Sequence, residues 1–442
     1  MPSWTEHRQQ LLFLFRWSAL AGLTGVLVGL QVAFFLHALA WVVAFHDRHR
    51  WLLWLLPLAG VATVWLYRRW GGAASRGNNL ILEALHSPDV DVPLRLAPLI
   101  LLTTLLAHLC GASVGREGTA VQMGAGLSGW LARRLRLSSA DTACLLQVGM
   151  ASGFGAVFGT PIAGAVFALE VPIVGRFAPA AVVPTLLGGL VGDAVCTAFG
   201  SEHAPYLIDL TRAGLPTPTP LEWHPVWIGP LVLAALLFGY ASRLFSHLTE
   251  AIEHHLRHRL REKLWHPVAG ALAVWGLVWL LGTQDFIGLG ANSQPNSPTG
   301  YSLASAFQPG QMPAWGWLAK LVFTALCVGS GLKGGEVTPL FFIGAALGNA
   351  LAGPLGLPVD LLAGLGMAAV FAGASNTPLA STLMAVELFG PVGRGLFSQG
   401  FVAYAALTCG LAYLVSGHQG IYASQRFEGR KHHLDPRRGH TG

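Results

Sequence analysis

Long runs of apolar residues recur along the whole sequence and limit what the chain can fold into. Residues 17–45, "WSALAGLTGVLVGLQVAFFLHALAWVVAF", are long enough to cross a bilayer and to tilt within it. Hydrophobic residues make up 53% of the 442 residues and charged residues only 11%, so the apolar surface far exceeds what one water-soluble core buries. The sequence therefore predicts an all-α polytopic membrane protein. No short apolar region with a cleavage site precedes the first span, so we expect no removable signal peptide.

Most of the other apolar runs are shorter, or are interrupted by glycine and proline. They occupy residues 51–66, 94–110, 120–132, 145–169, 180–199, 226–246, 267–282, 318–332, 340–372, 379–390 and 397–416. Runs too short to span, with glycines at their starts, are typical of helices that stop partway through the bilayer.

The sequence contains an internal repeat. The segment "GMASGFGAVFGTPIAGAVFALE" at 149–170 aligns with "GMAAVFAGASNTPLASTLMAVE" at 366–387 at an offset of 217, with nine identities in 22 positions. The motif "GREGT" at 115–119 shares a G-x-E-x-T frame with "GGEVT" at 334–338, at an offset of 219. Two related halves are therefore expected. The predicted parts are a first transmembrane repeat, an external connector, a second repeat and a basic cytoplasmic tail, at residues 1–200, 201–225, 226–425 and 426–442.

The distribution of charge predicts how the chain is oriented. Residues 247–266 carry four Lys or Arg and the segment after Tyr422 carries five, so both are expected on the cytoplasmic side. Residues 284–314 contain no Lys or Arg, and the connector holds one Arg against three acidic residues, so both are expected outside. Both termini would then be cytoplasmic in the inner (plasma) membrane, and the second repeat would be inverted relative to the first. Inverted repeats place a binding site near the middle of the membrane, framed by the ends of half-helices.

The two glycine-bounded motifs suit an anion site inside the membrane. A helix start flanked by Gly115 and Gly118 exposes backbone N–H groups, and its dipole adds partial positive charge, so it can hold an anion without a full cation. An intramembrane carboxylate is costly if it is charged and unpaired, so Glu117 should pair, protonate or face a watered cavity. A carboxylate at an anion site can also occupy that site itself, and its protonation would couple anion movement to proton movement. We predict Glu117 and Glu336 as gating and proton-carrying groups; a structural ion pair with Arg116 is the alternative for Glu117.

Other polar features receive plainer interpretations. Glu170 and Glu387 stand at helix ends and are expected to be structural caps or interface pairs. The five cysteines are odd in number and scattered through apolar segments, which indicates small buried side chains and neither disulfides nor a metal cluster. The net charge of +6 lies in loops and the tail and does not indicate nucleic-acid binding. We expect no cofactor.

Together these motifs resemble the CLC chloride channel and transporter family. The resemblance rests on "GREG" before a glycine-rich helix, "GGEVTP", "TPIAGAVFALE" and "NTPLASTLMAVE", and it covers about residues 11–425. It implies a homodimer of broken and tilted transmembrane helices, with a separate anion pathway in each subunit. It also implies that Glu117 is the external gate and that Tyr422, in "GIYASQ", caps the central anion from the inside.

The departures from the common CLC pattern point to one branch of the family. Ordinary members carry a serine that holds chloride, whereas this chain reads "SRGNNLILEAL", with Asn79 at the expected contact. Chloride/proton exchangers keep an internal proton glutamate where this chain has Val171, and an apolar residue where it has Glu336, followed by Thr338. With "GREGT" in place of "GREGP", the set resembles the fluoride-exporting branch, the prokaryotic fluoride/proton antiporters. A chloride-selective channel or chloride/proton exchanger is the alternative.

The chemistry of fluoride agrees with these donors. Fluoride is small and strongly hydrated, so stripping its water requires concentrated donors such as helix N–H groups, the Asn79 amide, the Thr338 hydroxyl and the Tyr422 phenol. Each side chain also has a structural interpretation. Asn79 could cap the helix that follows it, Thr338 could be a core or capping residue, and Tyr422 could belong to an interfacial aromatic belt.

The proton route to the cytoplasm needs a second group, because Val171 cannot titrate. Glu336 is the candidate, and Glu336 or Thr338 could also anchor the Glu117 side chain when the gate swings inward. The expected partners are fluoride, or chloride in the alternative, together with protons, membrane lipid and a second copy of the chain.

Two other classes of protein fit less well. The spacing of His254 and His258, with His255 between them, could hold zinc on one helix face of a membrane metalloenzyme, but the segment lacks an HExxH motif and is rich in arginine. A structural membrane scaffold would leave the paired intramembrane glutamates unexplained.

Overall fold

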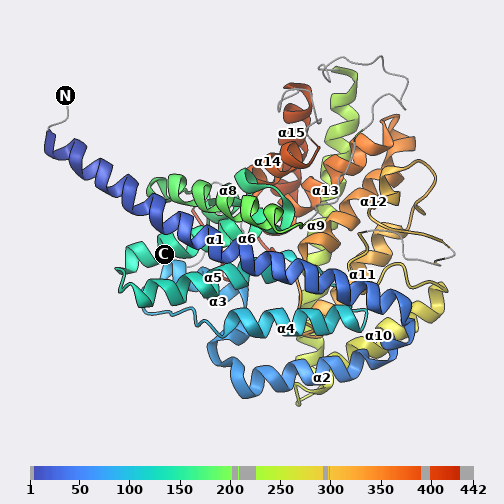
Figure 1. Cartoon of the computed structure of the whole chain (residues 1–442). Coiled ribbons are helices and arrows are strands. Elements are labelled where there is room, and N and C mark those ends of the chain that lie inside the picture. The colour runs from blue at the N-terminus through green and yellow to red at the C-terminus, as the bar shows by residue number, and fades with distance from the viewer. Residues whose placement is uncertain are drawn as a thin grey trace, which may run out of the picture.

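The computed structural model describes residues 4–201, 208, 225–291, 297, 299–389 and 399–428. Within these ranges the chain is mostly helical, as the apolar runs predicted (Figure 1). Strands β1 (Ile173–Val174) and β2 (Arg426–Phe427) form a short parallel pair that ties the last described residues to the first half.

The helices before residue 201 are α1 (Trp4–Arg48), α2 (Leu56–Leu66), α3 (Asn78–His86), α4 (Leu96–Leu109), α5 (Glu117–Arg134), α6 (Ser139–Phe158), α7 (Pro161–Glu170) and α8 (Val182–Ala198). Those after residue 225 are α9 (Ile228–Arg259), α10 (Trp265–Leu281), α11 (Gly316–Gly329), α12 (Val337–Leu355), α13 (Val359–Ser375), α14 (Pro378–Phe389) and α15 (Gln399–Val415). Short 3₁₀ or π turns are η1 (Arg50–Leu55), η2 (Tyr67–Gly71), η3 (Gly72–Arg76), η4 (Pro179–Ala181), η6 (Pro225–Trp227) and η7 (Ser305–Phe307).

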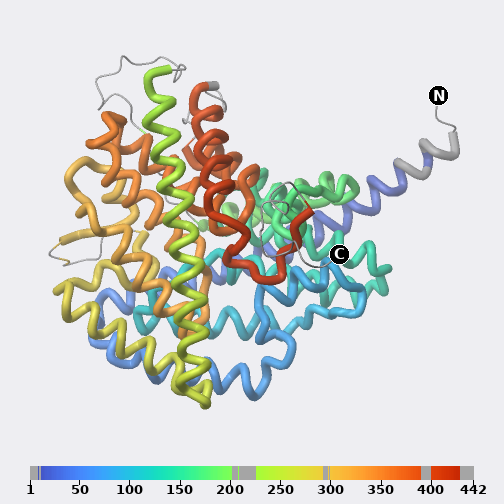
Figure 2. The backbone as a smooth tube through the Cα atoms, turned by 180° about the vertical axis from the view of Figure 1, so that it is seen from behind, coloured from blue at the N-terminus to red at the C-terminus, as the bar shows by residue number. Residues whose placement is uncertain are grey.

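Helices of the two halves lie side by side. In Figure 1 the helices α1 to α8 gather on one side and α11 to α15 on the other, while α10 crosses to pack against α2. Figure 2, from behind, shows α9 beside α15, and these two helices are in contact. The order of elements also repeats, because α4 to α7 have counterparts in α11 to α14.

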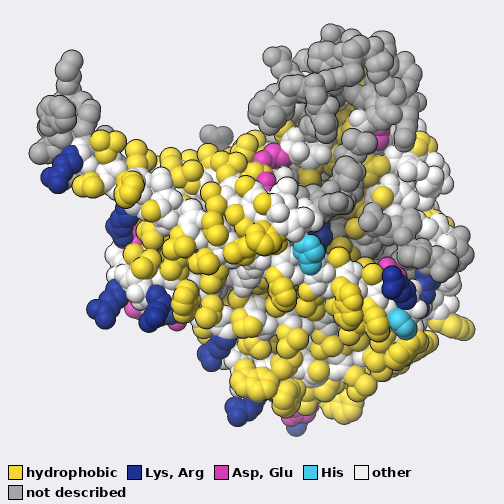
Figure 3. All heavy atoms as spheres, viewed as in Figure 1, with side chains coloured by type: hydrophobic (Ala, Val, Ile, Leu, Met, Phe, Trp, Pro, Cys, Tyr) yellow, Lys and Arg dark blue, Asp and Glu magenta, His cyan; other side chains and the backbone are white. Residues whose placement is uncertain are grey.

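Six helical stretches are long and apolar enough to cross a membrane: 11–48, 50–86, 139–158, 179–198, 225–259 and 337–355. Apolar side chains cover most of the face shown in Figure 3, and many of the Lys and Arg side chains lie at its edges. The described chain is therefore a polytopic helical protein with an apolar outer surface.

Two apolar runs that the sequence presents as continuous are each broken into two helices. The run at 145–169 divides between α6 and α7, where Gly159 takes a positive φ of 73° and Pro161 follows. The run at 340–372 divides between α12 and α13, where Gly356 has φ 64° and Pro358 follows. Glycine adopts this left-handed conformation without strain, and proline then starts the next helix, so both breaks have a local cause.

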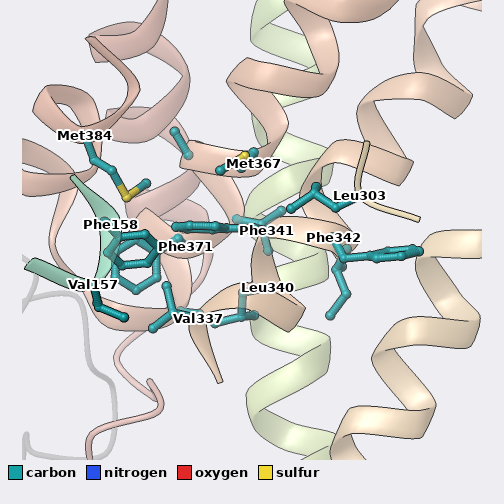
Figure 4. Close-up of a cluster of buried hydrophobic side chains, with 14 of the residues drawn as sticks. Val157, Phe158, Leu303, Val337, Leu340, Phe341, Phe342, Met367, Phe371 and Met384 are labelled. Atoms are coloured by element: carbon teal, nitrogen blue, oxygen red, sulfur yellow. The ribbon is translucent and has the colours of Figure 1, made fainter. Parts of the chain in front are cut away.

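Aromatic rings fill the core where the two halves meet. Phe158, at the end of α6, packs on Phe341 of α12 with ring centroids 5.2 Å apart, and Phe341 meets Phe371 of α13 edge-on at 5.6 Å (Figure 4). The Tyr422 ring joins this cluster through Phe167, at 6.2 Å. Tyr422 therefore lies in the protein interior, so its assignment to an interfacial aromatic belt was wrong.

The cysteines are free thiols. Those at 110, 196, 327 and 409 are buried, as predicted, and Cys144 is half-buried. Most of the connector, at 202–207 and 209–224, and the tail at 429–442 lie outside the described residues, so their predicted sides of the membrane stay predictions.

Candidate ion-binding site and gate

The two glycine-bounded motifs meet in space. Gly115 and Gly335 form an isolated antiparallel bridge, in which each backbone N–H donates to the other residue's carbonyl, with N to O distances of 2.5 and 2.6 Å. Helix α5 begins two residues after Gly115, and α12 begins two residues after Gly335. The starts of two helices from different halves are therefore held next to each other by a reciprocal pair of hydrogen bonds.

This bridge corrects the register of the repeat. The shared G-x-E-x-T frame aligns Glu117 with Glu336, at an offset of 219. The structure pairs Gly115 with Gly335 and starts the helices at Glu117 and Val337, an offset of 220. Glu117 is therefore the first residue of its helix, whereas Glu336 is the residue just before its helix.

Glycine is required where the bridge passes the start of α5. A Cβ atom added to Gly335 would lie 2.9 Å from the backbone nitrogen of Gly118, 3.1 Å from that of Glu117 and 3.2 Å from that of Arg116. Three backbone nitrogens at the start of α5 thus lie close to Gly335, where a side chain would crowd them. Such a group of donors at the positive end of a helix dipole suits an anion.

The Glu117 carboxylate itself occupies the space between the two helix starts. Its side chain is 1% exposed. Its Oε2 atom accepts hydrogen bonds from the backbone nitrogens of Arg116 and Thr338, each at 3.1 Å, and its Oε1 atom accepts one from the Thr338 hydroxyl. The Arg116 guanidinium lies 3.6 Å from Oε1, so the ion pair considered as an alternative is present as well.

Thr338 holds the Glu117 carboxylate, which is one of the three roles considered for it. It is the second residue of α12, so its backbone N–H is one of those that no earlier turn of the helix can satisfy. The glutamate of the first half therefore caps the helix start of the second half, which is how an anion would bind there.

The side chain of Asn79 contacts the segment that follows Tyr422. Its Oδ1 accepts a hydrogen bond from the backbone nitrogen of Ser424, at 3.1 Å, and it does not cap α3, whose N-cap is Gly77 with φ 57°. The capping role considered for Asn79 was therefore wrong. Its contact holds the segment that carries Tyr422 against α3.

The neighbouring Asn78 lies closer to the helix start of α5, and the sequence reasoning missed it. A Cβ atom on Gly118 would be 3.3 Å from Asn78 Nδ2, so the amide faces the backbone beside the gate residue. The Oδ1 atom of Asn78 and the Oε1 atom of Gln122 are buried and have no hydrogen-bond partner among the described residues. The doublet "NN" after Gly77 was the only signal, and sequence alone cannot say which of two adjacent asparagines faces inward.

Glu336 and Tyr422 lie in the same region as Glu117. Glu336 is half-buried at the start of α12, and the charged groups that face it are Lys333 and Glu253, which is on α9. Tyr422 lies within electrostatic range of both Glu336 and Glu117. The structure therefore brings Glu117, Glu336, Thr338 and Tyr422 to one region.

Glu170 and Glu387 are structural caps, as predicted. Glu170, at the end of α7, accepts hydrogen bonds from the backbone nitrogens of Leu379 and Ala380 at 3.1 and 2.8 Å. Glu387 accepts from those of Ile162 and Ala163 at 3.0 and 2.7 Å. Each glutamate thus caps the first turn of the other half's helix, which locks α7 and α14 together.

No group of three or more His, Cys, Asp or Glu suited to a metal ion occurs in the described ranges. His254, His255 and His258 lie near the end of α9 with Arg257 and Arg259. The zinc site considered for the histidine segment thus gains no support from this part of the chain.

The fold and site define a class of protein: a polytopic helical membrane protein with an anion-type site between opposed helix starts. The sequence profile described as "Voltage gated chloride channel" matches residues 59–417. A "Chloride/fluoride channel protein" from Pseudomonas syringae pv. tomato is 43% identical over 97% of this chain and 90% of its own length. The protein belongs to the voltage-gated chloride channel (CLC) family.

Solved structures agree with this assignment. A structure described as a CLC-type fluoride/proton antiporter has a TM-score of 0.83 and 33% identity, and it covers 97% of this chain and all of its own. A slow cyanobacterial Cl⁻/H⁺ antiporter has a TM-score of 0.72 over 91% of this chain and 94% of its own, and at 18% identity it supports the fold alone.

Proposed function

We propose that this protein is a fluoride/proton antiporter that exports cytoplasmic fluoride in exchange for protons. One observation carries the proposal: the Glu117 carboxylate sits at an anion position, bonded to the backbone N–H and the hydroxyl of Thr338. A fluoride ion that binds there must displace the carboxylate. A displaced carboxylate loses its donors and binds a proton more readily, so anion binding and proton uptake are linked.

The choice of fluoride rests on the donors and on the relatives. The site offers helix N–H groups, a hydroxyl and the Asn78 amide, and dense donors of this kind replace the hydration of a small anion. Asn79 would act indirectly, because its amide oxygen positions the segment that carries Tyr422. The relatives with 43% and 33% identity are described as a chloride/fluoride channel protein and a fluoride/proton antiporter.

Glu336 is the proposed second proton group. It is half-buried beside the gate and faces Lys333 and, on α9, Glu253. The protein would work as a homodimer in the bacterial inner membrane, with both termini cytoplasmic and one pathway in each subunit. The positively charged end of α9 supports this orientation.

Transport by purified protein in liposomes tests the proposal. Liposomes loaded with fluoride are diluted into fluoride-free buffer, and fluoride efflux and proton uptake are recorded together, with chloride-loaded liposomes as the control. We expect fluoride efflux to drive proton uptake in a fixed ratio and to be much faster than chloride efflux. Faster chloride exchange would assign the protein to the chloride-selective alternative, and fluoride flux without proton movement would make it a channel.

A further inference from the structure

Two buried histidines lie near the loop that carries Glu117, and the proposed function gives them no role. His108 is in the last turn of α4 and is 2% exposed; His46 is in the last turn of α1 and is 4% exposed. Neither ring nitrogen of His108 has a hydrogen-bond partner among the described residues, and Nε2 of His46 has none either. Buried polar atoms are normally hydrogen-bonded, so three such atoms on two neighbouring rings need an explanation.

The His108 ring faces the gate loop. It is directed at the backbone of Gly115, although the geometry leaves both nitrogens without a hydrogen bond. Oε2 of Glu117 lies 2.9 Å from the position that a Cβ of Gly115 would occupy. His108 and the Glu117 carboxylate thus both adjoin Gly115, which has no side chain.

His46 extends this line away from the gate. Its Nδ1 is 3.0 Å from the carbonyl oxygen of Leu109, and because a carbonyl can only accept, Nδ1 carries the hydrogen and Nε2 has the lone pair. The ring rests on Gly111, where an added Cβ would lie 2.7 Å from Cε1 and 3.1 Å from Nε2. Gly111 has φ 74°, so this position accepts no other residue without strain or a clash with His46.

The charged groups around His108 favour transfer of a proton through its ring over lasting protonation of the ring. The charged and titratable groups that face His108 are Lys320 on α11, Arg116 and His46, and those that face His46 include Asp47 and Arg50. Lys320 is fully buried and donates to the carbonyls of Phe286 and Gly288, at 3.1 and 2.9 Å, which holds it close by. Lys320 and Arg116 repel a proton that rests on His108, so the ring would pass a proton on to a carboxylate instead of keeping it.

We propose that His46 and His108 form the outer proton path of this transporter, which delivers protons from the external face to Glu117. In the proposed topology α1 starts in the cytoplasm, so its last turn, with His46 and the half-buried Asp47, lies at the outer side. A proton bound at one nitrogen of His108 lets the other nitrogen release its own, after which the ring returns to a neutral form. This inference rests on the proposed exchange of fluoride for protons.

The test compares coupled transport in His108→Gln with that of the unmodified protein. Glutamine keeps polar atoms at the site but cannot carry a proton. We expect coupled exchange to slow roughly ten-fold or more, with an unchanged fluoride-to-proton ratio and unchanged fluoride binding by calorimetry. His46→Gln should act in the same direction. His37→Gln is the matched control, because His37 is on α1 as well but is exposed, and it should transport normally.

Chemical rescue separates a proton path from packing. Imidazole added outside the liposomes should restore exchange in His108→Ala, whereas pyrazole, which has the same ring size but is not protonated near neutral pH, should not. Equal rescue by both compounds, or exchange at the normal rate in His108→Gln, would overturn the inference. Absence of fluoride/proton exchange in the unmodified protein would instead overturn the proposed function.

Discussion

The two gate motifs look alike in sequence, yet they place their glutamates differently. Glu117 is the first residue of α5, is almost fully buried, and accepts three hydrogen bonds, two of them from Thr338 across the interface between the halves. Glu336 is one residue earlier relative to α12 and is half-buried beside Lys333. Successive side chains at a helix start point in different directions. The shift of one residue therefore places the Glu117 carboxylate between the helix starts and leaves Glu336 as a half-buried lining group. The pairing of motifs therefore does not make their carboxylates equivalent.

Removing the charge of Glu117 should have the largest effect. Glu117→Gln can neither titrate nor compete with the anion as a carboxylate does, so we expect proton coupling to be abolished. Fluoride-driven proton uptake into liposomes is the measurement. If uptake continued at the normal rate in this variant, Glu117 would not be the proton-coupled gate.

The same change at Glu336 should be severe but different in kind. We expect Glu336→Gln and Glu336→Ala to give folded dimers in which fluoride and proton fluxes are both strongly slowed or uncoupled, because a second titratable group is lost. Size-exclusion chromatography checks the fold, and paired flux measurements check the coupling. Full coupled exchange in both variants would make Glu336 a passive lining residue.

Thr338 links the two motifs, because it belongs to the second motif but donates hydrogen bonds to Glu117 of the first. Thr338→Val keeps the shape and the backbone N–H but removes the hydroxyl that donates to Glu117. A hydrogen bond to a charged group contributes about 1.5 to 3 kcal/mol, so the position of the gate should shift roughly ten-fold or more in favour of the displaced carboxylate. The variant also loses one donor to fluoride, so we expect little net change in fluoride affinity and a slower turnover, because the carboxylate returns less readily. Turnover at the normal rate would show that the hydroxyl does not hold the gate.

The two adjacent asparagines should have different roles: we expect Asn78 to contact fluoride and Asn79 to position the segment that carries Tyr422. Asn78→Ala removes the amide next to Gly118, so we expect weaker fluoride binding with little change in folding. Asn79→Ala removes the acceptor for the Ser424 N–H, so we expect an effect on rate through the Tyr422 segment. Calorimetry and flux measurements on both variants test this division. Normal binding in Asn78→Ala together with lost binding in Asn79→Ala would reverse it.

Glu170 and Glu387 should show the smallest effect on transport. Each accepts two backbone hydrogen bonds from the other half, so Glu170→Gln or Glu387→Gln should weaken charged caps that contribute about 0.5 to 2 kcal/mol each. We expect a lower unfolding temperature with an unchanged fluoride-to-proton ratio. A changed ratio in either variant would add it to the proton path.

The sequence predicted the class of fold because apolar runs, repeats and loop charges are properties of the chain itself. It also predicted the capping roles of Glu170 and Glu387, because both glutamates stand at the ends of repeated helices. The break after Ser375 falls between two apolar runs of the sequence, whereas the break after Phe158 lies inside a run that the sequence presents as continuous.

The details of the site could not be predicted in the same way. The one-residue difference between the motifs depends on the bridge between Gly115 and Gly335, which is a contact between distant parts of the chain. Which of Asn78 and Asn79 faces the start of α5 depends on how the first turn of α3 is rotated about its axis. His46 and His108 carry no motif at all, and only their burial, with three ring nitrogens that lack a partner among the described residues, draws attention to them.

Measuring proton uptake during fluoride binding tests directly whether fluoride displaces the Glu117 carboxylate, which then binds a proton. Calorimetric titration of the purified protein with fluoride, in two buffers that differ in ionisation enthalpy, gives the number of protons bound with each ion. If fluoride displaces the Glu117 carboxylate from the helix starts, the unmodified protein should take up a proton fraction approaching about one, and Glu117→Gln should take up none. Equal proton uptake in both proteins would contradict the account, because the proton would then bind at a group other than the gate.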